Sequence, residues 1–113
     1  MFTQDNLIQF LNSFDRNKHR KMLDVYITSL KNHIQICENA AATQNSSDLQ
    51  ASTHDLKSLC FMLKAQNEGE LAESIEDALK SNSPETAFEK TPLLIEKINT
   101  LIEIMEGYDI QPD

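Results

Sequence analysis

Glycine, proline and tryptophan are scarce in this chain of 113 residues, which has two glycines, three prolines and no tryptophan. Folds rich in β-strands need frequent turn residues, so this scarcity favours a few long helices joined by short loops. The length suits one ordinary domain and leaves little room for two. With 40% hydrophobic and 25% charged residues, we expect a globular core that forms without disulfides or metal.

Positively charged residues are also scarce: the chain has ten lysines and arginines against 18 aspartates and glutamates, and its formal net charge is −8. Such a surface repels a phosphate backbone, so we expect no nucleic-acid partner. The densest basic run, from Arg16 to Lys21, leads straight into an apolar helical pattern. We interpret it as the solvated start of a helix.

Long apolar runs and paired cysteines are missing as well. No stretch approaches the ~18 apolar residues that span a membrane, and the first residues, MFTQDNLIQFL, do not resemble a signal peptide. Cys37 and Cys60 make no CxxC pair. We therefore predict a cytoplasmic protein without a membrane span and with two reduced, buried thiols.

The spacing of apolar residues predicts a short helix followed by four main ones. The short helix is capped by Thr3 or Asp5 and carries apolar residues from Leu7 to Phe14. The expected ranges of the main helices are about 19–42, 48–64, 70–80 and from Pro84 to about 107, and the turns between them include 43–47 and 67–69. Pro92 either kinks the last helix or restarts it, and both alternatives stay open.

Four helices with short connections favour an all-α fold, an antiparallel four-helix bundle with a short additional N-terminal helix. We predict a single domain over residues 1–107. Residues 108–113 are expected to form a flexible tail.

The central stretch STHDLKSLCF, residues 52–61, separates into two faces when it is drawn as a helix. Leu49, Leu56, Cys60 and Leu63 form one stripe, which we predict to face the core. His54 lies roughly 160° from Leu56 and therefore points outward. The same outward sector holds the side chains of Gln50, Lys57, Ser58, Phe61 and Lys64.

This outward face has an unusual composition for a protein with so many acids, because it carries lysines and no carboxylate. An exposed imidazole with an ammonium at i+3 (Lys57) and a hydroxyl at i+4 (Ser58) is suited to carry a phosphoryl group. Phe61 is a large apolar residue where a polar one is expected, which indicates a docking patch. The helical-wheel projection by itself leaves a second interpretation open, in which His54 is an ordinary solvated residue.

Other polar groups have simpler interpretations. His33 and Cys37 are spaced i, i+4 and could share a metal, but no second ligand pair accompanies them, so we predict no metal site. The carboxylates of the later helices are expected on solvated outer faces; they include Glu68, Glu70, Glu73, Glu76 and Asp77.

The residues around His54 resemble the histidine-containing phosphotransfer (HPt) domain of multistep two-component signalling. The motif of that family is a histidine followed by Leu at +2, Lys at +3 and Gly or Ser at +4, matched by His54, Leu56, Lys57 and Ser58. A long helix, a small-residue end and a polar loop precede the histidine helix in both, so the resemblance spans about residues 7–105. One departure is Lys64, which stands where the family often has glycine.

The resemblance implies that His54 accepts a phosphoryl group through Nε2 from the phosphoaspartate of a receiver domain and passes it to another response-regulator receiver. Lys57 and Ser58 would stabilise the phosphate. Gln50, Phe61 and Lys64 would dock the receiver.

The same resemblance implies a monomer whose partners are receiver domains and a hybrid sensor histidine kinase. Mg²⁺ would sit on the receiver, so this chain is expected to need no cofactor and to have no ATP-dependent kinase activity. The competing interpretation is a helical adaptor that binds receivers without being phosphorylated.

Overall fold

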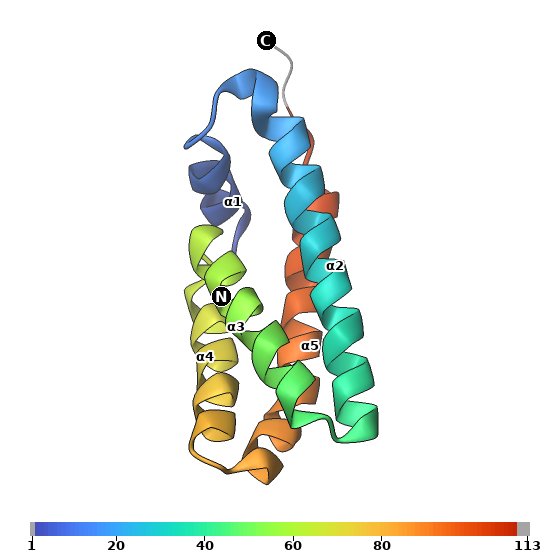
Figure 1. The fold of residues 1–113 in the computed structure, drawn as a ribbon. Helices are drawn as coiled ribbons and strands as arrows, with labels where there is room; N and C mark the ends of the chain where they lie inside the picture. The colour runs from blue at the N-terminus through green and yellow to red at the C-terminus, as the bar shows by residue number, and fades with distance from the viewer. Residues whose placement is uncertain (1, 111–113) are drawn as a thin grey trace.

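Residues 2–110 are the part of the chain that this computed structural model describes, and they contain five α-helices and one 3₁₀ turn. They are α1 (Gln4–Leu11), η1 (Arg16–Lys18), α2 (His19–Thr43), α3 (Ser46–Met62), α4 (Gln66–Lys80) and α5 (Pro84–Glu106). The long helices α2 to α5 alternate in direction, and α1 lies above the end of α3 (Figure 1). The predicted all-α four-helix bundle with a short leading helix is confirmed.

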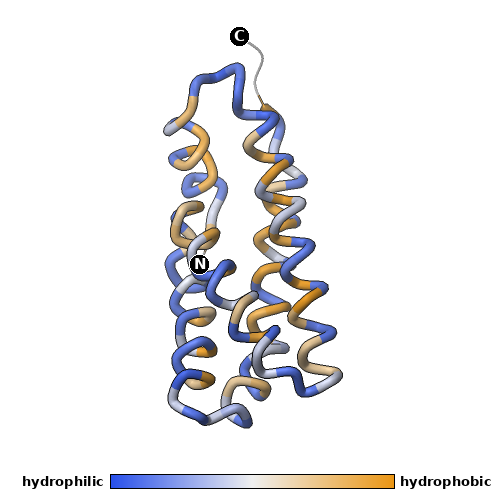
Figure 2. The backbone as a smooth tube through the Cα atoms, viewed as in Figure 1, coloured by the Kyte–Doolittle hydropathy of each residue, from blue (hydrophilic) through white to orange (hydrophobic). Residues whose placement is uncertain are grey.

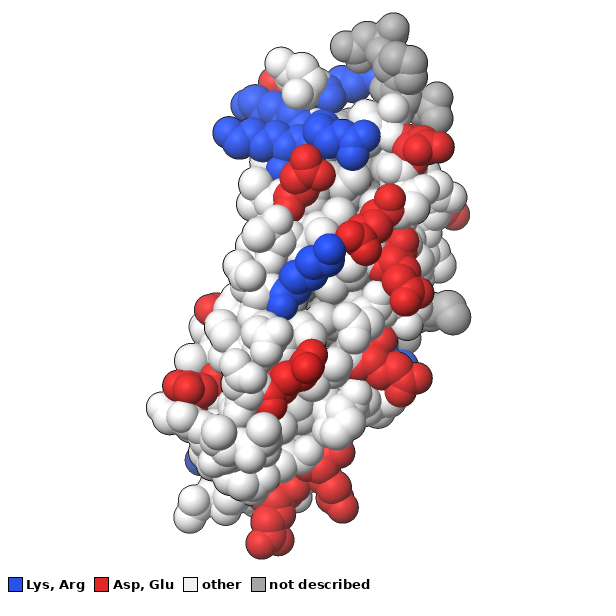
Figure 3. All heavy atoms as spheres, turned by 90° about the vertical axis from the view of Figure 1, so that its right-hand side faces the viewer, with Lys and Arg blue, Asp and Glu red and all other residues white. Residues whose placement is uncertain are grey.

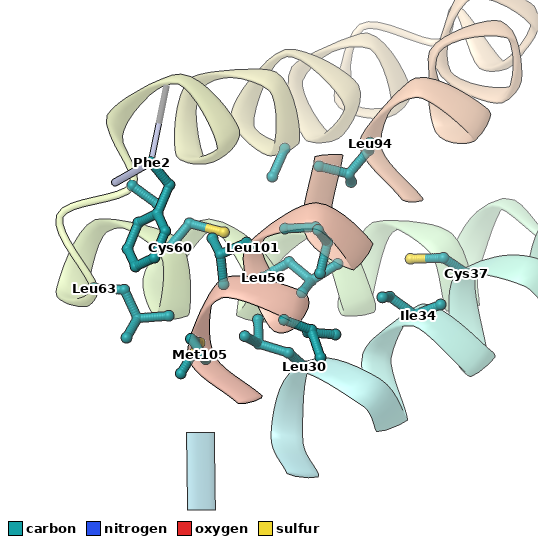
Figure 4. Close-up of a cluster of buried hydrophobic side chains, with 14 of the residues drawn as sticks. Phe2, Leu30, Ile34, Cys37, Leu56, Cys60, Leu63, Leu94, Leu101 and Met105 are labelled. Atoms are coloured by element: carbon teal, nitrogen blue, oxygen red, sulfur yellow. The ribbon is translucent and has the colours of Figure 1, made fainter. Parts of the chain in front are cut away.

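The core runs along the inside of the bundle, where α2, α3, α4 and α5 all contribute buried aliphatic side chains. Hydrophobic positions recur along each helix between polar ones (Figure 2), which is the pattern of amphipathic helices around one core. In Figure 4, Leu30 and Ile34 of α2, Leu56 and Cys60 of α3 and Leu101 of α5 converge on this interior. Each buried leucine or isoleucine side chain among them stabilises the fold by about 1.5–3 kcal/mol.

The short helix α1 is anchored to the bundle rather than loosely attached. Leu7, Phe10 and Leu11 are buried, and so is Phe2 just before the helix, which lies beside Cys60 in Figure 4. Thr3 caps α1 by accepting a hydrogen bond from the backbone N–H of Asn6, whose side chain accepts from the backbone N–H of Thr3 in return. This reciprocal cap satisfies two backbone donors that a helix start leaves open.

Three of the helix ends adopt the same left-handed turn, and none of them uses glycine. Gln44, Lys64 and Asn82 have φ values of 56°, 65° and 60°. In each turn the next N–H donates to a carbonyl five residues earlier, as in a Schellman motif. These bonds, all 2.8 Å, run from Asn45 to Ala40, from Ala65 to Cys60 and from Ser83 to Ala78.

Two of the predicted turns differ from those in the structure. The polar run 43–47 contains only two non-helical residues, because Asn45 accepts a hydrogen bond from the N–H of Asp48 and so starts α3 early. The predicted turn at 67–69 is wrong, since these residues belong to the first turn of α4. Gly69 is helical there and lies against the ring of Phe61, whose atom Cε1 would overlap with a β-carbon at Gly69.

The ends of the chain differ in detail from the sequence interpretation. The first helix ends at Leu11, so Phe14 follows it. α5 is one continuous helix through Pro92, with Pro84 at its start as expected. Beyond α5, Tyr108 and Ile110 pack partly buried against the core, whereas residues 111–113 of the predicted tail lie outside the described residues. Within residues 2–110, no helix combines the length and apolar character that crossing a membrane requires.

The left-handed position of Lys64 generates a test. Replacing Lys64 with glycine is expected to stabilise the protein by about 0.5–1 kcal/mol, because a left-handed conformation costs an L-residue roughly 1–2 kcal/mol and costs glycine nothing. Urea unfolding of the variant measures the change. The matched control is Lys97→Gly, an exposed position inside α5, which should lose about 1 kcal/mol. A loss of stability in both variants would contradict the role assigned to this turn.

Candidate functional site

His54 lies in the middle of α3 with its side chain 57% exposed. The opposite side of the helix is buried, as the wheel predicted, and includes Leu49, Leu56, Cys60 and Leu63. Ser46 to Met62 form a helix because Asn45 caps its start and the left-handed Lys64 ends it. The helix therefore fixes the direction in which the imidazole leaves the bundle.

A buried carboxylate from the neighbouring helix holds the imidazole in place. Glu76 of α4 is only 2% exposed, and its Oε2 lies 2.7 Å from Nδ1 of His54. Lys57 donates to the other oxygen, Oε1, at 2.8 Å, and the ammonium of Lys80 lies 3.4 Å from Oε2. One carboxylate thus gathers three basic side chains from two helices.

This arrangement corrects two expectations. Glu76 does not lie on a solvated outer face, and the surroundings of His54 do contain an acid. A wheel of α3 alone could not reveal it, because the acid comes from another helix. A signal was present in α4 itself, where Glu76 falls in the apolar stripe, directly after buried Ile75 and four residues after buried Ala72. Glu68, at 6% exposure, is also buried against expectation.

The contact with Glu76 decides which ring nitrogen of His54 faces outward as an acceptor. An ionised carboxylate only accepts hydrogen bonds, so the proton of the contact sits on Nδ1. In the neutral imidazole the lone pair then belongs to Nε2. Since Nδ1 is turned toward the buried carboxylate, Nε2 is the nitrogen with a free lone pair in this half-exposed ring.

The charges in this cluster hold Glu76 ionised. Burial by itself raises the pKa of Glu76, but the hydrogen bonds from Lys57 and His54 and the charges of Lys57 and Lys80 outweigh it, so the pKa is lowered overall. The hydrogen bond from Lys57 to Glu76 also raises the pKa of Lys57. Both groups therefore stay charged near neutral pH.

The remaining predicted site residues fall on two sides of His54. Gln50 lines a hollow of about 540 Å³ together with His54, Asp55 and Glu76. Ser58, Phe61 and Lys64 instead line a groove of about 450 Å³ further along α3. The Ser58 hydroxyl donates to the backbone carbonyl of His54 at 3.4 Å, so it is turned toward its own helix. The structure therefore brings Lys57 close to the imidazole and places the three proposed docking residues on both flanks.

The second histidine considered from the sequence, His33, belongs to a polar contact between α2 and α3. Its Nδ1 lies 2.9 Å from the hydroxyl of Ser52, and the Cys37 thiol donates to the same hydroxyl at 3.5 Å. Nε2 of His33 lies 3.7 Å from Asp55. No group of three or more metal-ligating side chains occurs between residues 2 and 110. Cys37 and Cys60 are buried and unpaired as predicted, and burial raises the pKa of Cys60 to about 12.

The basic run 16–21 occupies one end of the molecule, where η1 meets α2. Arg16, Lys18, Arg20 and Lys21 are exposed, and Figure 3 shows lysines and arginines gathered at this end while acidic side chains are spread over the rest of the same face. The run is exposed at a helix start, as the sequence interpretation had it.

Comparison with protein families gives a match between residues 21–106 and the Hpt domain. The chain belongs to the Hpt domain family. Comparisons with curated proteins and with solved structures give no match. Hpt domains are phosphotransfer intermediates of phosphorelays without kinase activity of their own, and they interact with receiver domains and kinases. The matched range contains α3 and α4 with His54, Lys57 and Glu76, whereas α1 and η1 precede it.

Stability of this Hpt domain should depend on pH through Glu76. A carboxyl whose pKa is lower in the folded than in the unfolded protein stabilises the fold at pH values above its unfolded pKa. That stabilisation is lost as the pH falls through its folded pKa. We expect Glu76→Gln to be less stable than the wild type at pH 7, and the difference to narrow below pH 4.5, the ordinary carboxyl pKa. Urea unfolding at several pH values measures it. Glu73→Gln, on the exposed side of α4, is the control; an equal effect there would contradict a specific role for Glu76.

The contact between Phe61 and Gly69 gives a second test. Gly69→Ala should displace the ring and destabilise the protein by about 1–3 kcal/mol, because the added methyl overlaps the ring. In a Phe61→Ala background the same change should stabilise by up to about 1 kcal/mol, since alanine is the better helix former. Unfolding free energies of the four proteins measure the coupling. The same sign in both backgrounds would contradict the contact.

Proposed function

We propose that this Hpt domain is a phosphorelay intermediate that accepts a phosphoryl group on His54 from the phosphoaspartate of one receiver and passes it to the receiver of another response regulator. The observation that carries the proposal is the contact between Nδ1 of His54 and the buried carboxylate of Glu76, at 2.7 Å. It leaves the Nε2 lone pair on an exposed ring, as a nucleophile in this role requires.

The reaction begins with the neutral imidazole. Nε2 attacks the phosphorus atom in line, the bond between phosphorus and the receiver carboxylate oxygen breaks, and the aspartate leaves as a carboxylate. As the bond between nitrogen and phosphorus forms, the ring gains positive charge while Nδ1 keeps its proton. Glu76 is placed to stabilise that charge, as the buried aspartate of a catalytic triad does for its histidine. Return transfer reverses these steps on a second receiver aspartate.

Lys57 and Ser58 act on the phosphoryl group and its surroundings in this proposal. An ammonium has three donors, and Lys57 uses one of them toward Glu76. The others are available to phosphoryl oxygens, whose negative charge a nearby cation stabilises. Ser58 provides a small side chain that folds back on its own helix, which leaves room for the receiver to approach His54.

The partners follow from the same proposal. Receiver domains dock over Gln50, Phe61 and Lys64, and a hybrid sensor histidine kinase stands upstream of the relay. The receiver supplies Mg²⁺ and its acidic site, so this chain needs no cofactor. We propose that the domain acts as a monomer in the cytoplasm.

Phosphotransfer from a labelled receiver tests the proposal. The wild type should take up label that is lost in acid and survives alkali, as expected for phosphohistidine, and His54→Gln should take up none. His19→Gln is the matched control: its ring contacts the backbone carbonyl of Phe14 rather than a carboxylate, and it should be labelled like the wild type. Label that persists in His54→Gln would overturn the site. Binding of receivers without any label on the wild type would favour the adaptor alternative.

A further inference from the structure

Two lysines approach the carboxylate of Glu76, and they are held differently. The side chain of Lys57 is 22% exposed and donates a hydrogen bond to Oε1 at 2.8 Å. The side chain of Lys80 is 55% exposed, and its ammonium lies 3.4 Å from Oε2, the oxygen that also contacts Nδ1 of His54. Within the described part of the chain, this contact of Lys80 is an ion pair without a hydrogen bond. Lys80 is therefore the more loosely held cation, and one carboxylate oxygen separates it from the imidazole.

Lys80 lies at the level of the turn of α3 that precedes His54. The helices α3 and α4 pack against each other and run in opposite directions (Figure 1). Gln50 and Lys80 each lie fifteen residues from Ala65, at the corner between the two helices, so an antiparallel pair places them at similar heights. Lys57 belongs to the turn of α3 that follows His54. The two lysines therefore lie on either side of the imidazole along the bundle.

The hollow beside the turn before His54 receives no cation from α3. Its lining includes Asp55 and Glu76, and α3 has no lysine or arginine before Lys57. Because a helical side chain leans towards the N-terminus of its own helix, the ring of His54 leans towards this hollow. A negatively charged group on the ring would be repelled by Asp55, which is exposed at the edge of the hollow. Any lysine or arginine that offsets this repulsion has to come from another helix, and Lys80 of α4 is placed to do so.

Little holds Lys80 to its present partner. Ion pairs of exposed side chains contribute little to stability, and Glu76 keeps the hydrogen bonds with Lys57 and His54 when Lys80 leaves. The lysine stem is flexible, and its ammonium offers three donors. A phosphoryl group carries nearly two negative charges and three acceptor oxygens. Exchanging a carboxylate that is already shared with two other partners for such a group is therefore favourable.

We propose that Lys80 is a second phosphoryl-binding residue of this domain. Once Nε2 of His54 carries the phosphoryl group, the ammonium of Lys80 turns from Oε2 of Glu76 to a phosphoryl oxygen. This inference rests on the proposed function for the identity of the phosphorylated nitrogen. Lys80 makes and breaks no covalent bond; it donates a hydrogen bond and offsets negative charge on the side opposite Lys57. Its departure also leaves Oε2 to the ring, whose positive charge this oxygen stabilises.

The second ionisation of the phosphoryl group reports a neighbouring cation directly. His54 is phosphorylated with phosphoramidate, which transfers its phosphoryl group to a histidine nitrogen and releases ammonia, and the ³¹P resonance absent from His54→Gln is followed against pH. Lys80→Gln should raise the midpoint of this titration by at least about 0.3 pH units, because a nearby cation favours the more ionised form. Lys80→Arg should keep the wild-type midpoint. Lys97→Gln, which changes an exposed lysine of α5, should also leave it unchanged.

A Glu76→Gln background separates direct contact with the phosphoryl group from an effect through the carboxylate. If Lys80 binds the phosphoryl group, Lys80→Gln raises the midpoint in this background as well. A midpoint that stays unchanged there assigns Lys80 to Glu76 alone and overturns the proposal. Equal midpoints in the wild type and the single variant Lys80→Gln overturn it too. Circular dichroism confirms that each variant is folded.

Label transfer from a phosphorylated receiver measures the consequence for the relay. Lys80→Gln should lower kcat about fivefold and change the KM for the receiver less, because the contact forms only with the transferring group. If phosphoramidate labels His54 but receivers do not, the relay is overturned, and a raised midpoint in Lys80→Gln still supports phosphoryl binding by Lys80. If receivers label the wild type and Lys80→Gln at equal rates and the midpoints are equal, Lys80 is overturned and the relay stands.

Discussion

The carboxylate of Glu76 is the point on which the site depends, because it joins α3 to α4 at the level where the imidazole leaves the bundle. A buried carboxylate without partners costs several kcal/mol, and here His54, Lys57 and Lys80 all lie within 3.4 Å of its oxygens. The cluster is therefore stable only while the two helices keep their register. Conversely, the register of α3 against α4 fixes the position of the imidazole. The geometry of the site therefore depends directly on how these two helices pack.

That register is set at the corner between the two helices. His54 and Glu76 each lie eleven residues from Ala65, and at about 1.5 Å per residue a tight corner brings them to the same level of an antiparallel pair. The left-handed Lys64 makes the corner tight, and the bond from the N–H of Ala65 to the carbonyl of Cys60 closes it. Gly69 then allows the ring of Phe61 to lie close against the backbone of α4. One added residue at this corner would move Glu76 away from His54.

Periodicity predicted the parts of this structure that depend on one helix at a time. The fold class, the buried stripe through Leu56 and the exposure of His54 follow from apolar spacing alone. The features that periodicity did not predict are of two kinds. Some depend on contacts between helices, as the burial of Glu76 does, and others arise where a residue other than glycine adopts the left-handed conformation at a helix end. Gln44 and Asn82 end helices inside polar runs that the composition does mark, whereas Lys64 ends α3 without glycine or a polar run. The composition therefore indicates a turn at Gly69, whose small size in fact serves packing.

A relay site has to release the phosphoryl group as readily as it accepts it, and the balance of charge around His54 suits that need. A lysine with no other partner would hold a phosphoryl dianion strongly and oppose its departure. Lys57 is already shared with Glu76, so its attraction for the phosphoryl group is offset by a fixed negative charge nearby. The imidazole is 57% exposed, so a partner can reach a phosphoryl group that it carries. In the proposed relay, Glu76 therefore does two opposing things: it stabilises the charged imidazole during transfer and keeps Lys57 from making the phosphorylated state too stable to pass on.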